Sequence, residues 1–379
     1  MKVGILTYHR AVNYGAYLQA CALCNRLNEE KDITAEIIDF HMKRENEKYS
    51  YDWPLWIKIK HPKKYNFYRR RKEAFNRAID DSLMSKSKEY CQSDEMSDFN
   101  EFVFGKYDAI IVGSDEIWNF NNFRGFPTPY WLIGNQGCKK FSYAASSRQD
   151  FSSLSNENRA LIQDTLSEYT FIGVRDRITQ SELKELLPGK EIHLCCDPTF
   201  LYDFKIDDKR GYNLIRQQRS FEIDRPTVLV MSDNVKLNKY IHKKMHEKFN
   251  LISVASYNSK YINMPNVTPS EWIGMINCAD LLFTTYFHGT CFGIITNTPF
   301  LSFGSKEKSS KVGSLLSDNG FEENYVDSID EFIGEDMLPR VVDKFINELY
   351  ISEFSKKCKD YVRKERNKFD NVFLNTLKS

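Results

Sequence analysis

The sequence predicts an α/β protein with two domains, each built on a parallel β-sheet. Short apolar runs alternate with helical patterns along most of the chain, which is typical of βα units. The chain has 379 residues, more than the roughly 250–300 residues at which a single core usually divides. Its content of 41% hydrophobic and 28% charged residues is ordinary for a globular protein and excludes a disordered chain.

The first domain is expected at residues 1–205. Its apolar runs predict strands at 2–7, 35–40, 107–112, 140–145, 171–175 and 192–196. Helical patterns lie between them at about 16–29, 154–168 and 177–187. A polar and aromatic segment at about 43–100 interrupts this alternation, and we interpret it as an insertion.

The second domain is expected at residues 220–330, after the polar stretch that follows Asp197-Pro198-Thr199. Its strands are predicted at 227–231, 250–255, 279–284 and 299–303, with helical patterns at about 236–248, 270–278 and 289–296. Residues 331–379 are expected to form a C-terminal helical segment, rich in Lys and Glu, that can cross back onto the first domain.

The insertion carries two basic runs, at residues 58–64 and 69–72. One interpretation is an electropositive arm for an anionic acceptor or a membrane surface. The other is a solvated helical insertion whose charge is balanced by Glu73, Asp80 and Asp81, and this interpretation is favoured.

Charge and targeting signals narrow the class of protein. The net charge is +1 and the pI is near 7.5, so no nucleic-acid partner is expected. Only Val3-Gly4-Ile5-Leu6 follow the first two residues before polar residues begin, which is too short for a secretory signal. No apolar run reaches the roughly 18 residues that a membrane span needs, although peripheral membrane association stays open.

The nine cysteines are odd in number and scattered, which predicts reduced thiols in a cytoplasmic protein. Cys21 and Cys24 have redox or zinc spacing. They lie inside a helical pattern and have no second pair as partners, so a structural role is favoured. No cluster of metal ligands is apparent, and no metal is expected.

Polar residues gather where predicted strands end, and ligands of open α/β sheets bind beyond the carboxyl ends of strands. After the first strand, Asn13 is expected to cap a helix, with Tyr14 and Gly15 beside it. After the strand at 107–112, Ser114 and Asp115 are in position to bind a sugar or to orient a loop. In both places, cap or turn chemistry alone is the alternative.

Arg175 stands at the end of an apolar strand, where an unpaired charge is costly to bury. It either pairs with Asp176 or binds a carboxylate or phosphate ligand. Lys311 follows the strand at 299–303 and can reach a phosphate. Lys306 and Lys308 in the same loop are the other candidates for that contact.

His288 lies in Phe287-His288-Gly289, where a buried strand turns into a helix. A helix N-terminus favours a bound anion, and an anion beside the imidazole would favour its protonated form. His288 is therefore a candidate general acid. The alternative is a histidine that only caps the helix.

Together these segments resemble the polysaccharide pyruvyl transferase family over about residues 1–316. The resemblance is carried by Asn13-Tyr14-Gly15-Ala16, Val112-Gly113-Ser114-Asp115, Ser142-Tyr143-Ala144-Ala145-Ser146, Val174-Arg175-Asp176, Asp197-Pro198-Thr199 and Phe287-His288-Gly289-Thr290. Three residues depart from the family's pattern. Tyr286 replaces a small polar residue, Glu116 stands where Gln is expected, and Arg148 replaces a Gly-containing turn.

The resemblance implies a fold like the type B glycosyltransferases, with an active cleft between two Rossmann-like halves. It implies transfer of pyruvyl from phosphoenolpyruvate to sugar hydroxyls, as a ketal, in the synthesis of a surface polysaccharide or glycan. His288 becomes the catalytic residue. The donor-binding residues implied are Arg175, Lys311, Gly289 and Thr290. The residues implied to line the acceptor side or the cleft are Asn13, Tyr14, Gly15, Ser114, Asp115 and Tyr286.

The donor phosphoenolpyruvate is a substrate, and no obligatory cofactor is expected beside it. The identity of the acceptor sugar stays open, as does whether its carrier is a lipid or a nucleotide. Two other functions remain as alternatives. One is a nucleotide-sugar-dependent glycosyltransferase of the same fold, and the other is a catalytically decayed protein that binds phosphate or glycan, which Tyr286 motivates.

Overall fold

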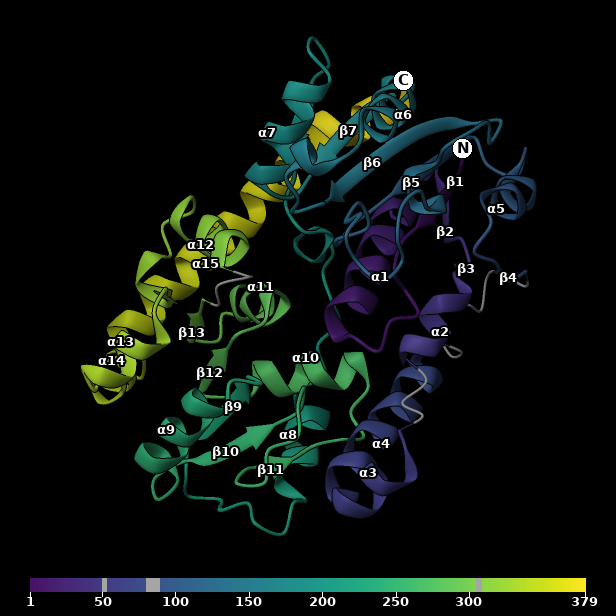
Figure 1. The fold of residues 1–379 in the computed structure, drawn as a ribbon. Helices are drawn as coiled ribbons and strands as arrows, with labels where there is room; N and C mark the ends of the chain where they lie inside the picture. The colour runs from purple at the N-terminus through teal and green to yellow at the C-terminus, as the bar shows by residue number, and fades with distance from the viewer. Residues whose placement is uncertain (50–52, 80–88, 305–308) are drawn as a thin grey trace. The chain divides into compact units, whose positions relative to one another are not determined.

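The computed structural model describes residues 1–49, 53–79, 89–304 and 309–379 (Figure 1). The chain forms two compact units. Unit 1 contains Met1–Ser50, Ile79–Asp203 and Glu365–Ser379, and unit 2 contains Tyr51–Ala78 and Phe204–Lys364. Each unit is an α/β structure with its own parallel sheet, which confirms the predicted fold class.

Unit 1 is built on a six-stranded sheet with the strand order β2-β1-β5-β6-β7-β8. The strands are β1 (Lys2–Leu6), β2 (Thr34–Ile37), β5 (Ala109–Val112), β6 (Lys139–Ala145), β7 (Phe171–Val174) and β8 (Ile192–Leu194). Its helices include α1 (Tyr14–Asn28), α2 (Lys43–Tyr49), α5 (Met96–Val103), α6 (Asn156–Ser167) and α7 (Arg177–Leu186). All neighbouring strands pair in parallel, and β1, β5 and β6 lie side by side in Figure 1.

Unit 2 repeats this plan with the strand order β11-β10-β9-β12-β13-β14. The strands are β9 (Thr227–Met231), β10 (Asn250–Ser253), β11 (Ile262–Asn263), β12 (Leu281–Thr284), β13 (Phe300–Phe303) and β14 (Tyr325–Val326). The helices are α3 (Leu55–Lys60), α4 (Pro62–Ala78), α8 (Asp208–Arg216), α9 (Val235–Met245), α10 (Pro269–Asn277), α11 (Phe287–Ile295), α12 (Ser309–Ser317), α13 (Ile329–Gly334) and α14 (Leu338–Phe345). β9 and β12 are buried along their whole length, which explains their nearly continuous apolar sequence.

Strand order reverses at one place in each sheet. In unit 1 the chain passes from β1 to β2 on one side and returns to place β5 on the other side of β1. In unit 2 it passes from β9 to β10 and β11, and then places β12 on the other side of β9. Such reversals are the topological switch points at which open α/β sheets bind ligands.

The predicted strands are all present, and most end within two residues of the predicted bounds. The run at 35–40 differs because β2 ends at Ile37, and Phe40 begins a separate short strand, β3 (Phe40–His41), that pairs with β4 (Cys91–Gln92). Between them, Asp39 turns its carboxylate to His9 and Arg10. The two-residue strands β11 and β14 were not predicted, because so short a segment has no readable periodicity.

The segment that sequence order suggests as an insertion has contacts in unit 2. Phe67 of α4 lies edge-on to the ring of Tyr257, with centroids 6.1 Å apart. Arg71 donates from Nη1 to the Ala255 carbonyl at 2.6 Å. Arg77 donates to the Asn266 side chain at 2.7 Å. Residues 53–78 therefore pack against unit 2, although they precede most of unit 1 in the chain.

The C-terminal segment is helical, as predicted, and its end belongs to unit 1. Helix α15 (Glu348–Lys368) begins in unit 2, and residues from Glu365 onward group with unit 1. Asp370 pairs with Arg26 of α1 at 2.5 Å. Phe373 is 1% exposed and meets the rings of Phe141 and Tyr143 of β6. Among the helices of the described residues, none is both long and apolar enough to cross a membrane.

Replacing Phe373 by Ala should destabilise the protein by about 3–5 kcal/mol, because it removes a buried ring and leaves a cavity against β6. Urea denaturation would measure the change. Phe104→Ala is the matched control, since Phe104 is 59% exposed and should cost little. Equal losses in the two variants would show that the C-terminal segment does not stabilise unit 1.

Candidate active site

The switch point of unit 1 begins at the end of β1. Asn13 is the N-cap of α1, as predicted, and its Oδ1 accepts hydrogen bonds from Gly15 N at 2.9 Å and Ala16 N at 3.4 Å. Tyr14 and Gly15 are buried in the first turn of the helix. The capping role of Asn13 is therefore established, and its role toward an acceptor stays a prediction.

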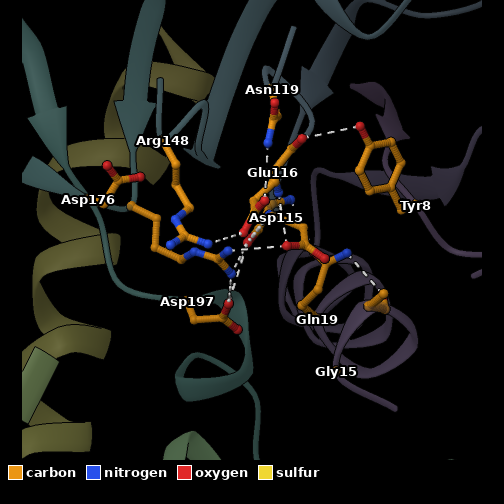
Figure 2. Close-up of polar contacts among 12 residues, drawn as sticks. Tyr8, Gly15, Gln19, Asp115, Glu116, Asn119, Arg148, Asp176 and Asp197 are labelled. Atoms are coloured by element: carbon orange, nitrogen blue, oxygen red, sulfur yellow. Dashed lines mark hydrogen bonds and ion pairs between the residues drawn. The ribbon is translucent and has the colours of Figure 1, made fainter. Parts of the chain in front are cut away.

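Ser114 and Asp115 follow β5 at the other side of the same switch point. The turn needs Gly113, because a Cβ there would lie 2.1 Å from the Tyr143 carbonyl oxygen and the residue has φ of +128°. Ser114 N donates to Gln19 Oε1 at 3.0 Å, and Gln19 Nε2 donates to Thr7 Oγ1 at 2.8 Å. Gln19 thus ties the β5 turn to α1 and β1, and Figure 2 shows it beside Asp115. The sequence alone gave Gln19 no role at the site.

Arg175 finds its partners in Asp197 and Asp115, and not in Asp176. Its Nη1 lies 2.6 Å from Asp197 Oδ2, its Nη2 lies 3.2 Å from Asp115 Oδ1, and its side chain is 4% exposed. Asp176 caps α7 instead, accepting from Thr179 N at 2.8 Å. Burial alone would lower the pKa of Arg175, but the carboxylates of Asp197 and Asp115 outweigh burial and raise that pKa.

The two ion pairs give Arg175 a structural role, because they fix two carboxylates at the ends of the strands. Two carboxylates compensate its charge, and in return the guanidinium fixes the side chain of Asp115. The Asp115 backbone, with φ of +79°, is bonded separately to the end of β6 through Ser146 N. The Asp115 side chain is 20% exposed, whereas that of Asp197 is fully buried. Asp115 is therefore the carboxylate of this trio that solvent or a substrate can reach.

The two departures from the family pattern in unit 1 contact each other. Arg148 Nη1 lies 3.1 Å from Glu116 Oε1, as Figure 2 shows. Arg148 has φ of +56°, in the left-handed region that favours glycine. The backbone shape expected of a Gly-containing turn is thus retained, while the side chain at this position now neutralises Glu116.

A second charged cluster in unit 1 escaped sequence analysis. His9 Nε2 lies 3.1 Å from Asp39 Oδ1, and Arg10 donates two hydrogen bonds of 2.7 Å to the same carboxylate. Burial alone would raise the pKa of Asp39, but hydrogen bonds and positive charge from His9 and Arg10 lower it to about 2. The sequence offered one indication of this cluster. His9 and Arg10 follow β1 and Asp39 follows β2, and these adjacent parallel strands end at the same edge of the sheet.

In unit 2, His288 is the second residue of α11 and follows β12 at the switch point. The N-cap position belongs to Tyr286, whose side chain makes no cap hydrogen bond, so His288 lies inside the helix and is not its cap. Its ring is half-buried and stands edge-on to Phe287, with centroids 5.3 Å apart. An imidazole in the first turn of a helix lies where backbone N–H groups favour an anion.

Gly289 allows α11 to approach β12. A Cβ at this position would lie 2.2 Å from Thr284 Oγ1 and 2.8 Å from Met231 Cε of β9. Thr284 Oγ1 in turn accepts a 2.9 Å hydrogen bond from Tyr286 N, so the start of the helix rests on this hydroxyl. Thr290 Oγ1 lies 2.7 Å from Ser302 Oγ of β13, and both residues are buried. Gly289 and Thr290 therefore have structural effects, and their donor contacts stay predictions.

Tyr286 points toward the ends of β9 and β10. Its hydroxyl is hydrogen-bonded to Ser256, which itself donates to the Ser232 carbonyl at 2.9 Å. Burial raises the pKa of Tyr286 and the negative charge of Asp233 adds to this, while the positive charge of Arg71 opposes it. Helix α4 thus contributes a cation near the switch point of unit 2, which the sequence alone did not indicate.

Lys311 is the third residue of α12 and is buried, with 7% exposure. Helix α12 follows β13, the neighbour of β12, so its N-terminus lies at the same edge of the sheet as that of α11. Lys306 and Lys308 lie outside the described residues.

Two buried hydroxyls also mark these edges. Ser146 follows β6 and Thr285 follows β12, and neither side-chain oxygen has a hydrogen-bond partner within the described part of the chain. Since buried polar groups are normally hydrogen-bonded, both oxygens are candidates for bonding a ligand.

All nine cysteines are free thiols. Cys21 and Cys24 lie one turn apart in α1, where burial raises the pKa of Cys21 to about 12 and Cys24 donates to the Ala35 carbonyl. Such thiols are inert, which agrees with a structural role. Across residues 1–49, 53–79, 89–304 and 309–379, no group of three or more His, Cys, Asp or Glu side chains is arranged to hold a metal ion.

Comparison with solved structures defines the class of fold. A UDP-GlcNAc 2-epimerase from Neisseria meningitidis, bound to UDP-GlcNAc, matches with a TM-score of 0.58 and 10% identity, over 100% of this chain and 99% of that chain. The UDP-GlcNAc 2-epimerase from Methanocaldococcus jannaschii matches with a TM-score of 0.51 and 12% identity, over 92% and 93% of the two chains. These neighbours have the type B glycosyltransferase fold, as predicted, and at such identity they show the fold alone.

The family follows from the sequence. The model of the polysaccharide pyruvyl transferase family matches residues 13–307, which is more than half of the chain and includes Asn13, Ser114 and His288. The chain therefore belongs to the polysaccharide pyruvyl transferase family. No curated protein matches it in sequence.

Replacing Asp39 by Asn should lower the free energy of unfolding by about 2 kcal/mol at pH 7, since the carboxyl pKa falls from 3.8 to about 2 on folding. A depressed pKa stabilises the fold above the unfolded value of 3.8, and this contribution is lost as the pH falls through that value toward 2. The stability difference from wild type should therefore shrink over this pH range. Urea denaturation at several pH values measures this stability difference. Asp164→Asn is the control, because Asp164 is exposed. A difference that does not change with pH would contradict the lowered pKa of Asp39.

Replacing Gly289 by Ala should destabilise unit 2 by about 1–3 kcal/mol, because the new methyl group overlaps Thr284 Oγ1. Adding Thr284→Ala to this variant should recover part of the loss. Gly334→Ala in α13 is the control, since a Cβ there meets nothing within 4 Å. Thermal unfolding gives the comparison, and equal effects at the two glycines would rule out the close approach.

Proposed function

We propose that this protein transfers pyruvyl from phosphoenolpyruvate to two hydroxyls of a sugar, forming a ketal on a surface polysaccharide or glycan. The observation that carries the proposal is His288 at the switch point of unit 2, in the first turn of α11 and within the segment that matches the family. This position combines a group that can carry a proton with a helix N-terminus that favours phosphate.

The reaction needs two proton transfers and the loss of one phosphate. A proton adds to the methylene carbon of phosphoenolpyruvate, which becomes the methyl group. One sugar hydroxyl attacks the central carbon, phosphate leaves with the C–O bond electrons, and a second hydroxyl closes the ketal. The two sugar hydroxyls release two protons. One of them returns to the group that protonated the methylene carbon, and the other leaves with the phosphate.

In this proposal His288 donates the proton to carbon. The N-terminus of α11 at Gly289 and Thr290 holds the donor's phosphate, together with Lys311 at the start of α12. As the central carbon develops charge resembling an oxocarbenium ion, negative charge builds up on the departing phosphate. The fixed positive groups stabilise that negative charge more effectively than mobile water does. The reaction as proposed uses phosphoenolpyruvate as a substrate and requires no cofactor.

In this proposal the carboxyl edge of the unit 1 sheet supplies the groups that bind the acceptor. Asp115 is the reachable carboxylate there and can accept a hydrogen bond from a sugar hydroxyl, while Arg175 holds it in position. Ser114, Asn13, Tyr14 and Gly15 complete this edge. Arg175 was predicted as a donor ligand, and its two ion pairs support a positioning role at least as well.

A nucleotide-sugar-dependent glycosyltransferase is the second candidate. The observation that favours it is the likeness in fold to an epimerase bound to UDP-GlcNAc. The two functions differ in the product that leaves, which is inorganic phosphate for pyruvyl transfer and a nucleotide for glycosyl transfer.

His288→Ala should lower the rate of pyruvyl transfer by about 10²–10⁴-fold, the usual contribution of a positioned general acid. Phosphate release from phosphoenolpyruvate, with mass spectrometry of candidate acceptors, measures the reaction. His246→Ala is the control, because His246 is exposed at the end of α9.

Three outcomes would decide against the proposal. Wild-type rates in the His288 variant would remove this residue from the mechanism. Release of UDP from UDP-GlcNAc in the presence of an acceptor, without phosphate from phosphoenolpyruvate, would support glycosyl transfer. Binding of phosphoenolpyruvate without turnover of any acceptor tested would support the decayed binding protein.

A further inference from the structure

Helix α3 presents an apolar face to solvent. Leu55 is 71% exposed, Trp56 is 64% exposed and Ile59 is 71% exposed. On a helix with about 100° between successive residues, these three side chains fall within an arc of about 100°. Single exposed apolar residues are common on protein surfaces, but three large ones on one helical face mark an interaction surface.

Positive charge surrounds this face. Residues 55–78, which form α3 and α4, contain nine Lys or Arg residues and one acidic residue, Glu73. That carboxylate is already paired with Arg69 at 2.6 Å. Because the whole chain has a net charge of only +1, the rest of the chain is net acidic and the cations are concentrated here. We define the α3 surface by its exposed members, Leu55, Trp56, Ile59, Lys60, Lys63 and Lys64.

The α3 surface is fixed to unit 2. Trp53, just before α3, packs on the rings of Tyr65 and Tyr68 of α4 at centroid distances of 6.0 and 5.7 Å. Lys58 lies over the Tyr65 ring at 5.2 Å. Helix α4 is in turn bonded to the body of unit 2, through Arg71 to Ala255. The face is thus preorganised, which reduces the entropic cost of binding.

We propose that the α3 surface docks on a lipid bilayer that contains anionic headgroups. An interfacial helix buries Trp and large aliphatic residues at the boundary of the acyl chains, while Lys and Arg beside it contact anionic headgroups. A polyanionic glycan, or a protein surface that carries acidic residues alone, would pair with the lysines but leave Leu55, Trp56 and Ile59 in water. A bilayer with anionic lipids satisfies both components, and this inference does not depend on the proposed function.

Flotation with vesicles tests the proposal on the full-length protein. Binding is expected to vesicles of phosphatidylcholine mixed with phosphatidylglycerol, and not to phosphatidylcholine alone. High salt should weaken binding because it screens the lysines. Replacing Lys60, Lys63 and Lys64 by Gln should weaken partitioning about fivefold for each lysine.

The apolar half of the surface is tested by Leu55→Ser, Trp56→Ser and Ile59→Ser combined, which should weaken partitioning by more than about tenfold. The matched control is Ile223→Ser, Val235→Ser and Leu349→Ser combined, since these residues are exposed by 58%, 66% and 69% elsewhere in unit 2. Circular dichroism of both triple variants confirms that they are folded.

Trp56 reports insertion directly. Of the five tryptophans, Trp118, Trp131 and Trp272 are buried and Trp53 is half-buried, whereas Trp56 is exposed. Lipids brominated in their acyl chains should quench its fluorescence, and Trp56→Leu should keep binding while it loses most of this quenching.

Several results would overturn the proposal. The protein could fail to bind anionic vesicles. The two triple serine variants could weaken binding equally. The protein could also bind vesicles while brominated acyl chains leave the Trp56 fluorescence unquenched. The last result, combined with displacement by a soluble polyanion, would identify the surface as a site for an acidic protein or glycan.

Discussion

Every strand pairing described in the two large sheets is parallel, and the rest of the structure depends on this constraint. Parallel strands end at one edge, so each βα turn of a sheet opens onto the same edge. Reversal of strand order then separates two neighbouring turns and leaves space for a ligand. The β1/β5 and β9/β12 reversals thus select which of many turns become candidate sites. At both reversals a glycine permits close contact, Gly113 against β6 and Gly289 against β12.

Buried charges are the second organising feature, and in unit 1 they are compensated in small groups. Arg175 lies between Asp115 and Asp197, Asp39 receives hydrogen bonds from His9 and Arg10, and the Glu116 carboxylate meets Arg148. An unpaired charge in a buried position would be costly, so each carboxylate is paired with a cation and held in one orientation. The position of the Asp115 carboxylate is therefore set by the fold before any ligand binds.

The helical segment of α3 and α4 serves unit 2 in two ways. Arg71 reaches the end of β10, and its charge acts on Tyr286 beside the switch point. The first turns of the same segment expose the apolar and basic α3 surface. A single stretch of chain therefore connects a residue near the candidate active site with a surface suited to a membrane. Tyr286, which replaces a small residue, is the point at which this segment influences the site.

The sequence by itself determined the parallel α/β class, the longer strands and the residues at their ends. Apolar periodicity and cap residues such as Asn13 are local signals, and local signals survive without tertiary context. His288 could be placed at a strand-to-helix turn for the same reason. Only the tertiary structure decided which partners the charged residues take. Arg175 pairs with Asp197 and Asp115 and not with its neighbour Asp176. Asp39 binds His9 and Arg10, and residues 53–78 pack on unit 2. These contacts join segments far apart in the chain, and their energies depend on burial and distance, which no spacing along the sequence encodes.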